Sequence, residues 1–297
     1  MLSRWSRAIS LCPMAGLGER LSRNKLPFPH LQNYSKAVER TTLDKDNNSF
    51  SKKDCHRAEL DHNDIGSSFQ VSGNMAFMSK PCSLALSPNS TLSVQEPEFK
   101  GFYRFILRLL LYYSKESRYI RKADVLYKRI IYQVDRPEIY DTFSLEKCFR
   151  TTYALLVLHM WLCLSRLKAE GKEGIEFGQY LYEVYNHDVE IRVAAAGVNL
   201  LLTTWMKDLE KIFYGNVAAY DAAILPEAAK DELSHVIWRN VFSDEDAPMP
   251  KGSSATAVQA LARYARREYA CLTLTDKEAL FSGNIMFSSL RKCSIQS

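Results

Sequence analysis

The sequence predicts an all-α protein: a single multi-helix domain preceded by a disordered N-terminal region. From residue 98 onward, apolar residues recur at the spacing of a helix face, and strand-like alternation is rare. Residues 26–97 are polar and irregular, so they cannot bury enough surface to offset the conformational entropy of the chain. The chain has 297 residues and is 46% hydrophobic, which is enough to bury a core without disulfide or metal staples.

The domain is expected to begin with two helices, over 99–113 and 117–134. In the first, Arg104 and Arg108 share one face. Another face carries an apolar stripe of Phe102, Phe105, Ile106, Leu109, Leu110 and Tyr113. The second helix is expected to bury Ile120, Val125, Ile130 and Ile131. It ends before Pro137, because the residue before a proline is pushed out of the helical region.

The longest predicted helix covers 143–170. It follows the capping pair Asp141-Thr142 and stops at Gly171, a residue typical of a helix C-terminus. Its middle, 154–164, is apolar on every side, which marks a central helix. His159 lies in this stretch, where a lone histidine is expected to be a hydrogen-bonded core residue.

Further helices are predicted over 174–186 and over 189–213, the second closed by Gly215. Pro226 is expected in the first turn of the next helix, which runs to residue 242. A loop rich in acid, proline and glycine then leads to a helix over 255–272. A short helix over 275–282 is expected to use Thr275 as its N-cap and Glu278 to complete a capping box.

The first 25 residues hold five basic residues and several serines against a single acid, Glu19. This composition is typical of a mitochondrial transit peptide, and the alternative is an ordinary basic N-terminus. The predicted organisation is therefore a transit peptide over 1–25, a disordered linker over 26–97 and the helical domain over 98–297. No segment has the roughly 20 apolar residues of a membrane-spanning helix.

The composition and motifs give no catalytic signature. The net charge of +5 is too small for a dedicated nucleic-acid-binding protein. The seven cysteines are odd in number, widely spaced and free of C-x-x-C, which argues against a disulfide scaffold or a zinc ribbon. H-E-x-x-H, Walker A, dinucleotide-binding and G-x-S-x-G motifs are absent from the sequence. We therefore predict no catalytic residue, no metal and no cofactor.

A basic stretch runs from Lys100 to Arg129, with nine lysines and arginines against two acids and with tyrosines interleaved. Such a stretch can face RNA, an anionic lipid surface or an acidic protein, and it can equally be a solvated helix face. The basic patch predicted within it consists of Lys115, Arg118, Arg121, Lys122, Lys128 and Arg129.

Two further patterns leave alternatives open. Asp188 and Arg192 lie at i and i+4, which favours an ion pair on one helix face. With His187, Glu190 and Asp221 they could serve an enzyme only if the fold brought them together. The second half also carries large aromatics whose spacing fits core packing or a groove for a partner helix, namely Tyr180, Tyr182, Tyr185, Trp205, Tyr214, Tyr220 and Trp238.

Over residues 115–281 the sequence resembles the ubiquinol–cytochrome c chaperone family. The resemblance depends on the order of five segments, each weak alone: 159–166 (HMWLCLSR), 186–192 (NHDVEIR), 213–221 (FYGNVAAYD), 236–242 (VIWRNVF) and 261–268 (LARYARRE). It implies an all-α assembly factor for respiratory complex III with no enzymatic activity.

The resemblance also implies a mitochondrial location on the matrix side of the inner membrane, with peripheral membrane contact. The implied partners are newly synthesised cytochrome b, a small helical assembly factor and the mitochondrial ribosome. The family signature is expected to form the core of the fold or a partner groove through Asp188, Arg192, Tyr220, Asp221, Trp238 and Arg239. The alternatives are a metal- or small-molecule-dependent enzyme and an RNA-binding mitochondrial translation factor.

Overall fold

The computed structural model describes residues 77, 79–97, 99–197, 202–243 and 253–290. Over these residues the protein is all-α, as predicted, and the only β pairing is an isolated bridge between Ala85 and Ile285. The predicted transit peptide and most of the predicted linker lie outside the described residues. In the described part, no helix is both long enough and apolar enough to span a membrane.

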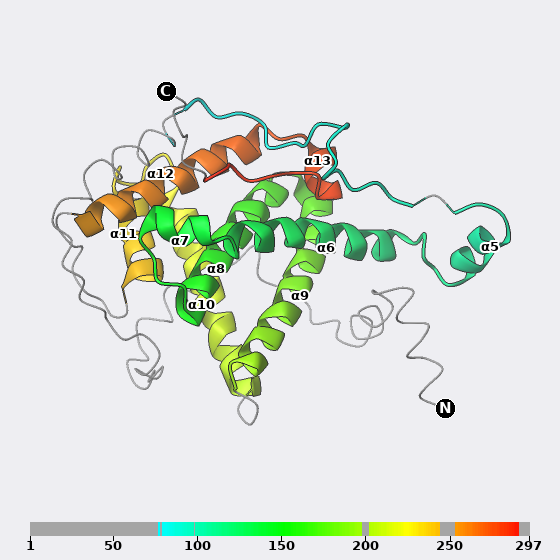
Figure 1. Ribbon diagram of the computed structural model, residues 1–297, viewed down its shortest axis with the longest axis horizontal. Coiled ribbons are helices and arrows are strands. Elements are labelled where there is room, and N and C mark those ends of the chain that lie inside the picture. The colour runs from blue at the N-terminus through cyan, green and yellow to red at the C-terminus, as the bar shows by residue number, and fades with distance from the viewer. Residues whose placement is uncertain (1–76, 78, 98, 198–201, 244–252, 291–297) are drawn as a thin grey trace.

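Helix α8 (Phe149–Lys168) forms the centre of the domain, as its uniform apolarity predicts. It packs against α6 (Lys115–Val134), α9 (Gly171–Ala195), α10 (Leu202–Ala223) and α12 (Ser253–Thr273). Figure 1 shows α6 and α12 crossing the upper part of the molecule, while α9 and α10 descend to a common lower end. The large side chains of Trp161 and Leu155 are fully buried in this arrangement.

The predicted helix over 143–170 is wrong at its start. The chain first forms α7 (Pro137–Phe143), which begins with a proline and buries Ile139, Tyr140 and Phe143. Asp141 and Thr142 therefore lie inside α7 and cap nothing. Ser144, in the left-handed region with φ 51°, ends α7, and α8 starts five residues later.

The predicted break between 186 and 189 is also wrong, because α9 continues through it to Ala195. Tyr185 and Val189 are buried on successive turns, so their packing keeps the helix intact. Gly171 has φ +67° and makes the predicted turn after α8. Gly174 is required by close packing, since a Cβ there would lie 1.8 Å from the Leu167 carbonyl oxygen. Gly215 closes no helix and lies inside α10.

Pro226 lies in a turn before α11 (Glu232–Ile237), which continues as the π-helix η1 (Trp238–Phe242). The last helix is α13 (Lys277–Ser282), with Asp276 at its N-cap position. Thr275 is therefore not the cap that the sequence predicted. Its hydroxyl instead donates to the Cys271 carbonyl at 2.8 Å and accepts from the Leu84 amide at 3.0 Å.

Two extended segments tie the ends of the domain together: the N-terminal strap (79–97) and the C-terminal strap (283–290). The Leu86 amide donates to the Asn284 carbonyl at 2.9 Å, and the Met286 amide donates to the Leu84 carbonyl at 2.9 Å. In Figure 1 the N-terminal strap, in cyan, runs along the top of the molecule, and the C-terminal strap, in red, runs below α12. The N-terminal strap buries Leu84, so this part of the predicted linker packs on the body. The domain accordingly extends beyond its predicted start at residue 98.

Candidate functional site

Asp188 and Arg192 form the predicted i, i+4 ion pair at the crossing of α9 and α6. The Arg192 Nε donates to Asp188 Oδ2 at 2.6 Å, and its two terminal nitrogens reach Asp135 at 3.3 and 3.2 Å. The Tyr127 hydroxyl donates to the same Asp188 oxygen at 2.8 Å. Burial and the Asp188 carboxylate both raise the pKa of Tyr127, so its hydroxyl stays protonated and keeps donating. This cluster fastens α9 to α6.

Tyr220 and Asp221 fasten α10 to α8. The fully buried Tyr220 ring lies 5.1 Å from the Trp161 ring, centroid to centroid. Asp221 accepts from the Trp161 indole nitrogen at 2.8 Å and from the Ser165 hydroxyl at 3.3 Å. Its second oxygen lies 3.6 Å from the Lys168 ammonium. A buried indole N–H needs such an acceptor, which gives Asp221 a structural role.

Trp238 and Arg239 lie in η1. The half-buried Trp238 ring stacks on Phe242 at 6.2 Å, whereas the Arg239 side chain is exposed. Helix α11 packs on α10, and η1 continues directly from α11. The six predicted signature residues therefore lie in pairs at three separate places in the fold. Arg239 is the one of the six whose side chain is exposed.

The carboxylates of the enzyme alternative do not converge. Asp188 bonds to Tyr127 and Arg192 on one side of α9, whereas Asp221 bonds to α8. His187 lies 4.0 Å from Glu190 on the surface, with 51% of its side chain exposed. Among the described residues, no group of three or more His, Cys, Asp or Glu side chains is placed to hold a metal ion.

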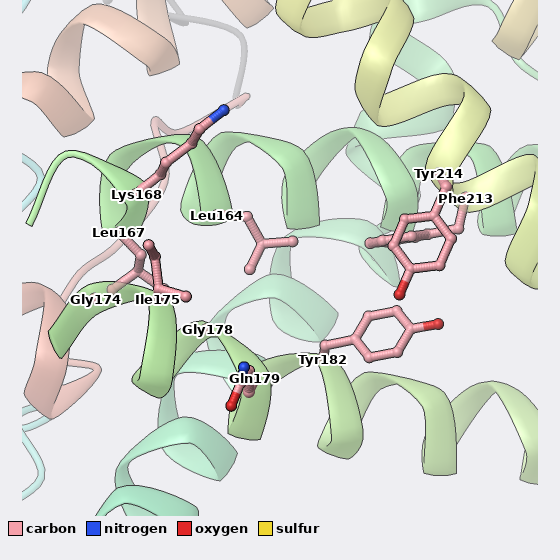
Figure 2. Close-up of a pocket in the computed structure, with 10 residues that line it drawn as sticks. All are labelled: Leu164, Leu167, Lys168, Gly174, Ile175, Gly178, Gln179, Tyr182, Phe213 and Tyr214. Carbon is pink, nitrogen blue, oxygen red and sulfur yellow. The ribbon is translucent and has the colours of Figure 1, made fainter. Parts of the chain in front are cut away.

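Two small clefts open on the body. Figure 2 shows the first, a cleft of about 40 Å³ between α8, α9 and α10, with Leu164, Tyr182 and Tyr214 in its wall. The second, of about 150 Å³, is lined by Phe149, Thr152, Tyr153, Leu156, Val189 and Arg192. Both are smaller than the roughly 300–1,000 Å³ of small-molecule pockets.

The aromatic residues of the second half pack mainly into the body, as the core interpretation predicts. Tyr185 and Tyr220 are fully buried, and Tyr180, Trp205 and Trp238 are packed against the core in half-buried positions. The Tyr182 and Tyr214 rings stack at 5.8 Å beside the smaller cleft. Of these aromatic residues, Tyr182 and Tyr214 line the smaller cleft.

The predicted basic patch is largely occupied by contacts within the chain. Lys115 pairs with Glu176 at 2.6 Å, and Lys128 pairs with Asp124 at 2.7 Å. Lys122 lies 4.0 Å from Glu96. These ion pairs partly neutralise the patch, although the Lys115 and Lys128 side chains are still 54% and 72% exposed.

The two arginines of this patch that face the straps and the preceding turn are also engaged. Arg121 covers the Tyr112 ring at 3.8 Å and donates to the Tyr112 carbonyl at 2.9 Å. Arg129 donates to the Gly283 carbonyl at 3.1 Å and to the Leu92 carbonyl, which joins α6 to both straps. Arg118 is exposed on α6.

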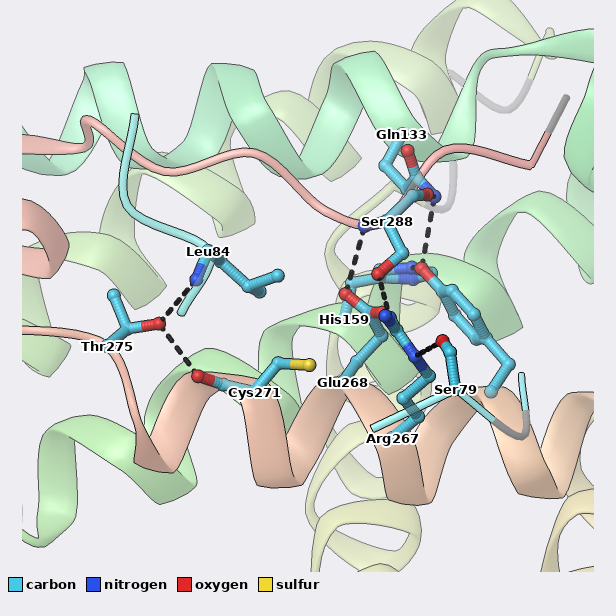
Figure 3. A network of polar contacts seen from close by, with 10 residues as sticks. Ser79, Leu84, Gln133, His159, Arg267, Glu268, Cys271, Thr275 and Ser288 are labelled. Atoms are coloured by element: carbon cyan, nitrogen blue, oxygen red, sulfur yellow. Dashed lines mark hydrogen bonds and ion pairs between the residues drawn. The ribbon is translucent and has the colours of Figure 1, made fainter. Parts of the chain in front are cut away.

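A buried polar network, shown in Figure 3, joins α6, α8, α12 and the C-terminal strap. His159 Nδ1 lies 2.7 Å from the Leu155 carbonyl, which can only accept, so this nitrogen carries the hydrogen. His159 Nε2 therefore accepts from the Tyr264 hydroxyl at 2.9 Å, and that hydroxyl accepts from Gln133 at 3.1 Å. Burial lowers the pKa of His159 to about 4, which keeps it neutral. The prediction of a hydrogen-bonded core histidine is confirmed.

Glu268 extends this network and was not identified from the sequence. Its fully buried carboxylate accepts from the Ser288 amide at 3.1 Å and from Arg267 at 3.2 Å. Arg267 also donates to the Ser79 hydroxyl at 3.1 Å, so both straps meet the same ion pair. The sequence signal that could have identified Glu268 is an acidic residue on an otherwise apolar helix face. This signal alone does not distinguish a buried acid from an exposed one.

Helix α5 (Phe102–Leu109) forms within the predicted helix over 99–113 and is shorter than predicted. Its stripe faces outward, with Phe102 76%, Phe105 64% and Leu109 75% exposed. Figure 1 places α5 at the far right, away from the packed body. The sequence identified the helix and its two faces, but a stripe of this kind equally fits core packing or an external surface.

Comparison with known proteins finds a match between residues 141–287 and the family model described as "Ubiquinol-cytochrome C chaperone". A Xenopus laevis protein named ubiquinol-cytochrome-c reductase complex assembly factor 1 is 26% identical over 175 residues, which are 58% of this chain and 83% of that protein. The Homo sapiens protein of the same name is 24% identical over 56% of this chain. This match spans about half (53%) of the length of the human protein.

A solved structure has the same fold. The crystal structure of the Cbp3 homolog from Brucella abortus matches with a TM-score of 0.51 and 25% sequence identity. The match covers 62% of this chain and 97% of the other. The Saccharomyces cerevisiae relative, named Protein CBP3, mitochondrial, is 24% identical over 47% of this chain and 41% of its own length.

Proposed function

Because the chain belongs, through residues 141–287, to the ubiquinol-cytochrome c chaperone family, we propose that it is a mitochondrial assembly factor for respiratory complex III. The observation that carries this proposal is the similarity to relatives named as assembly factors of the ubiquinol-cytochrome c reductase complex. The basic, serine-containing first 25 residues support the mitochondrial location.

The protein acts by binding and not by catalysis. Its client is newly synthesised cytochrome b, met on the matrix side of the inner membrane together with a small helical assembly factor. Two features support a binding role. The carboxylates of Asp188 and Asp221 are engaged in helix junctions, and the two clefts of about 40 and 150 Å³ are small for a substrate. A client segment would therefore dock on the outside of the body.

The direct test is removal of the native copy from cells, followed by complementation with this chain. Loss of assembled complex III on native gels, restored by the chain, supports the proposal. Affinity capture of the chain after brief labelling of mitochondrial translation should enrich labelled cytochrome b over the other translation products. Unchanged complex III after removal would overturn the assembly role.

Arg239 offers a variant that separates docking from folding. Its side chain is exposed on η1 beside the half-buried Trp238, so Arg239→Glu should leave the free energy of unfolding within about 0.5 kcal/mol of wild type. We expect it to reduce capture of labelled cytochrome b or of the small partner several-fold. Lys230→Glu, another exposed basic residue before α11, is the matched control. Equal capture by both variants and wild type would move the docking face away from η1.

A contact with the mitochondrial ribosome would have to use the open part of the basic patch. Replacing Arg121 or Arg129 would break contacts to Tyr112 or to the straps, so a loss of binding in those variants would report unfolding. Arg118→Glu changes an exposed side chain on the same helix, with Lys172→Glu as the exposed control on α9. We expect the first variant to reduce cosedimentation with ribosomes. No difference between the two makes this part of α6 a solvated face.

A further inference from the structure

Helix α5 and the turn after it form an exposed apolar arm, which we define as residues 100–113. Its outward side chains include Phe102, Tyr103, Phe105, Leu109, Leu110 and Leu111, each between 62% and 76% exposed. Scattered exposed apolar residues are normal on protein surfaces, but a contiguous group of this size marks an interaction site. The arm therefore has the character of an interaction site on the described surface.

The charges of the arm identify the chemistry of that partner. Lys100, Arg104 and Arg108 are exposed, and the sequence from 99 to 115 contains no acidic residue. In a helix, positions 104 and 108 lie one turn apart on one side, while 102, 105, 106 and 109 share the other. A short helix with an aromatic and aliphatic face and arginines at its border matches an anionic lipid surface, where apolar groups enter the headgroup boundary and cations meet phosphates.

The anchoring of the arm fits this role. The Tyr112 ring lies under the Arg121 guanidinium at 3.8 Å and contacts Phe99 edge to face at 5.8 Å, so the base of the arm is fixed to α6. Gly101, at φ +66°, and Leu111, at φ +58°, bracket α5 with left-handed turns. A leucine in that region is strained, and its side chain is 69% exposed. The base is held by the body while the apolar face is turned away from it.

A helix of eight residues has little stability of its own in water, where about 12–15 residues are needed for even marginal helicity. Contact along its apolar face would supply the missing stabilisation. We propose that the arm is a membrane-surface anchor that inserts Phe102, Phe105 and Leu109 into the headgroup boundary of a bilayer containing anionic phospholipid. This inference deepens the proposed placement at the inner membrane and rests on it for its biological setting, but the lipid binding is testable alone.

The test is flotation of the purified full chain with vesicles of phosphatidylcholine, alone or mixed with phosphatidylglycerol at roughly three to one. The wild-type chain should float with the mixed vesicles and much less with phosphatidylcholine alone. Arg104→Gln with Arg108→Gln should lower the partition coefficient onto the mixed vesicles by about 30-fold, since each arginine near such a surface contributes a factor of about five. Phe105→Ser with Leu109→Ser should lower it at least about tenfold on both vesicle types.

Matched controls remove the same chemistry elsewhere. Leu225→Ser with Leu274→Ser removes two leucines that are 54% and 56% exposed outside the arm. Lys172→Gln with Lys230→Gln removes two exposed positive charges. Both control proteins should bind vesicles within about twofold of wild type.

Three results would overturn the proposal: wild-type chain that does not float, arm variants that float like the controls, or a wild-type chain whose arm is covered by a second copy. The last is read by sedimentation velocity, where the serine variant alone would convert a dimer to a monomer. None of these readouts involves complex III. Normal flotation in a chain that fails to restore complex III would therefore reject the proposed function and keep the anchor, and the reverse pattern would reject the anchor alone.

Discussion

Helices α5 and α8 are both rich in apolar residues, yet they end up in opposite environments. In α8, apolar side chains surround the helix, and Leu155, Trp161 and Leu162 are fully buried among neighbouring helices. In α5, the apolar residues occupy one side with arginines beside them, and Phe102 and Leu109 are 76% and 75% exposed. Apolar content alone therefore does not decide burial. The decisive quantity is how many other elements of the same chain can cover the helix.

The largest contrast between the two helices should come from removing one large aromatic side chain from each. Trp161→Ala removes a fully buried indole that stacks on Tyr269, contacts the tilted Tyr220 ring and donates to Asp221. We expect a loss of about 3–5 kcal/mol in the free energy of unfolding, measured by urea denaturation. Phe102→Ala in α5 is the control and should change it by less than about 0.5 kcal/mol. Similar losses in both variants would mean that α5 is packed in solution.

The next effect concerns the neutral histidine inside α8. The pKa of His159 is about 4 in the folded chain against an ordinary value of 6.5, because burial disfavours its charged form. Between these values the unfolded chain binds more protons, so stability is complete above pH 6.5 and is lost as the pH falls toward 4. The expected loss from this residue is about 3 kcal/mol.

His159→Gln should remove that part of the pH dependence, measured as the difference between free energies of unfolding at pH 6.5 and pH 4. His187→Gln, on the surface of α9, should keep the wild-type dependence. An unchanged pH dependence in His159→Gln would show that the core around α8 admits the charged imidazole. The surroundings of His159 would then be more exposed to water than the structure indicates.

The same comparison explains what the sequence could predict. The helical content, the central position of 154–164 and the Asp188–Arg192 pair depend on spacing along one helix, and spacing is visible in the sequence. The outward face of α5 is not, because an apolar stripe has the same spacing whether or not other elements cover it. The continuation of α9 past His187 is likewise decided by the packing of Tyr185 and Val189 on other helices.

The polar contacts between distant segments could not be predicted from the sequence for a related reason. Thr275 meets Leu84 across 191 positions, and Arg129 meets Gly283 across 154. Local sequence makes Thr275 a plausible cap and Arg129 a solvated cation, and only the straps change those roles. The basic patch was predicted as a run of charge. Lys128 pairs with Asp124 within α6, which spacing can predict, whereas the contacts of Lys115, Lys122 and Arg129 come from segments outside that helix.

Glu183, on α9, is intermediate between the buried residues of α8 and the exposed residues of α5. Its effect on the free energy of unfolding should be smaller than that of His159. Glu183 is half-buried, burial raises its pKa to about 7, and its Oε2 has no hydrogen-bond partner among the described residues. The folded chain binds this proton more tightly, so the stabilisation present below pH 4.5 is lost as the pH rises through 7. Glu183→Gln should therefore raise the free energy of unfolding at pH 8 by about 1 kcal/mol, after allowance for partial exposure.

Glu190→Gln, on the exposed surface of the same helix, is the control for Glu183, with thermal unfolding at pH 4.5 and pH 8 as the measurement. The Glu183 variant should exceed it at pH 8 and match it at pH 4.5. A gain of equal size at both pH values would come from helix propensity or packing, and it would remove Glu183 from the set of groups whose burial sets the pH dependence.

The smallest effect on stability is expected in the arm itself. Phe105→Ser with Leu109→Ser removes apolar surface that is already 64% and 75% exposed, so unfolding exposes little more of it. The free energy of unfolding measured without lipid should stay within about 0.5 kcal/mol of wild type. Leu155→Ser with Leu158→Ser, two fully buried positions on α8, should prevent folding. If the arm variant instead lost more than about 1.5 kcal/mol, its side chains would have to be covered by the chain itself, and no free face would remain for a membrane to contact.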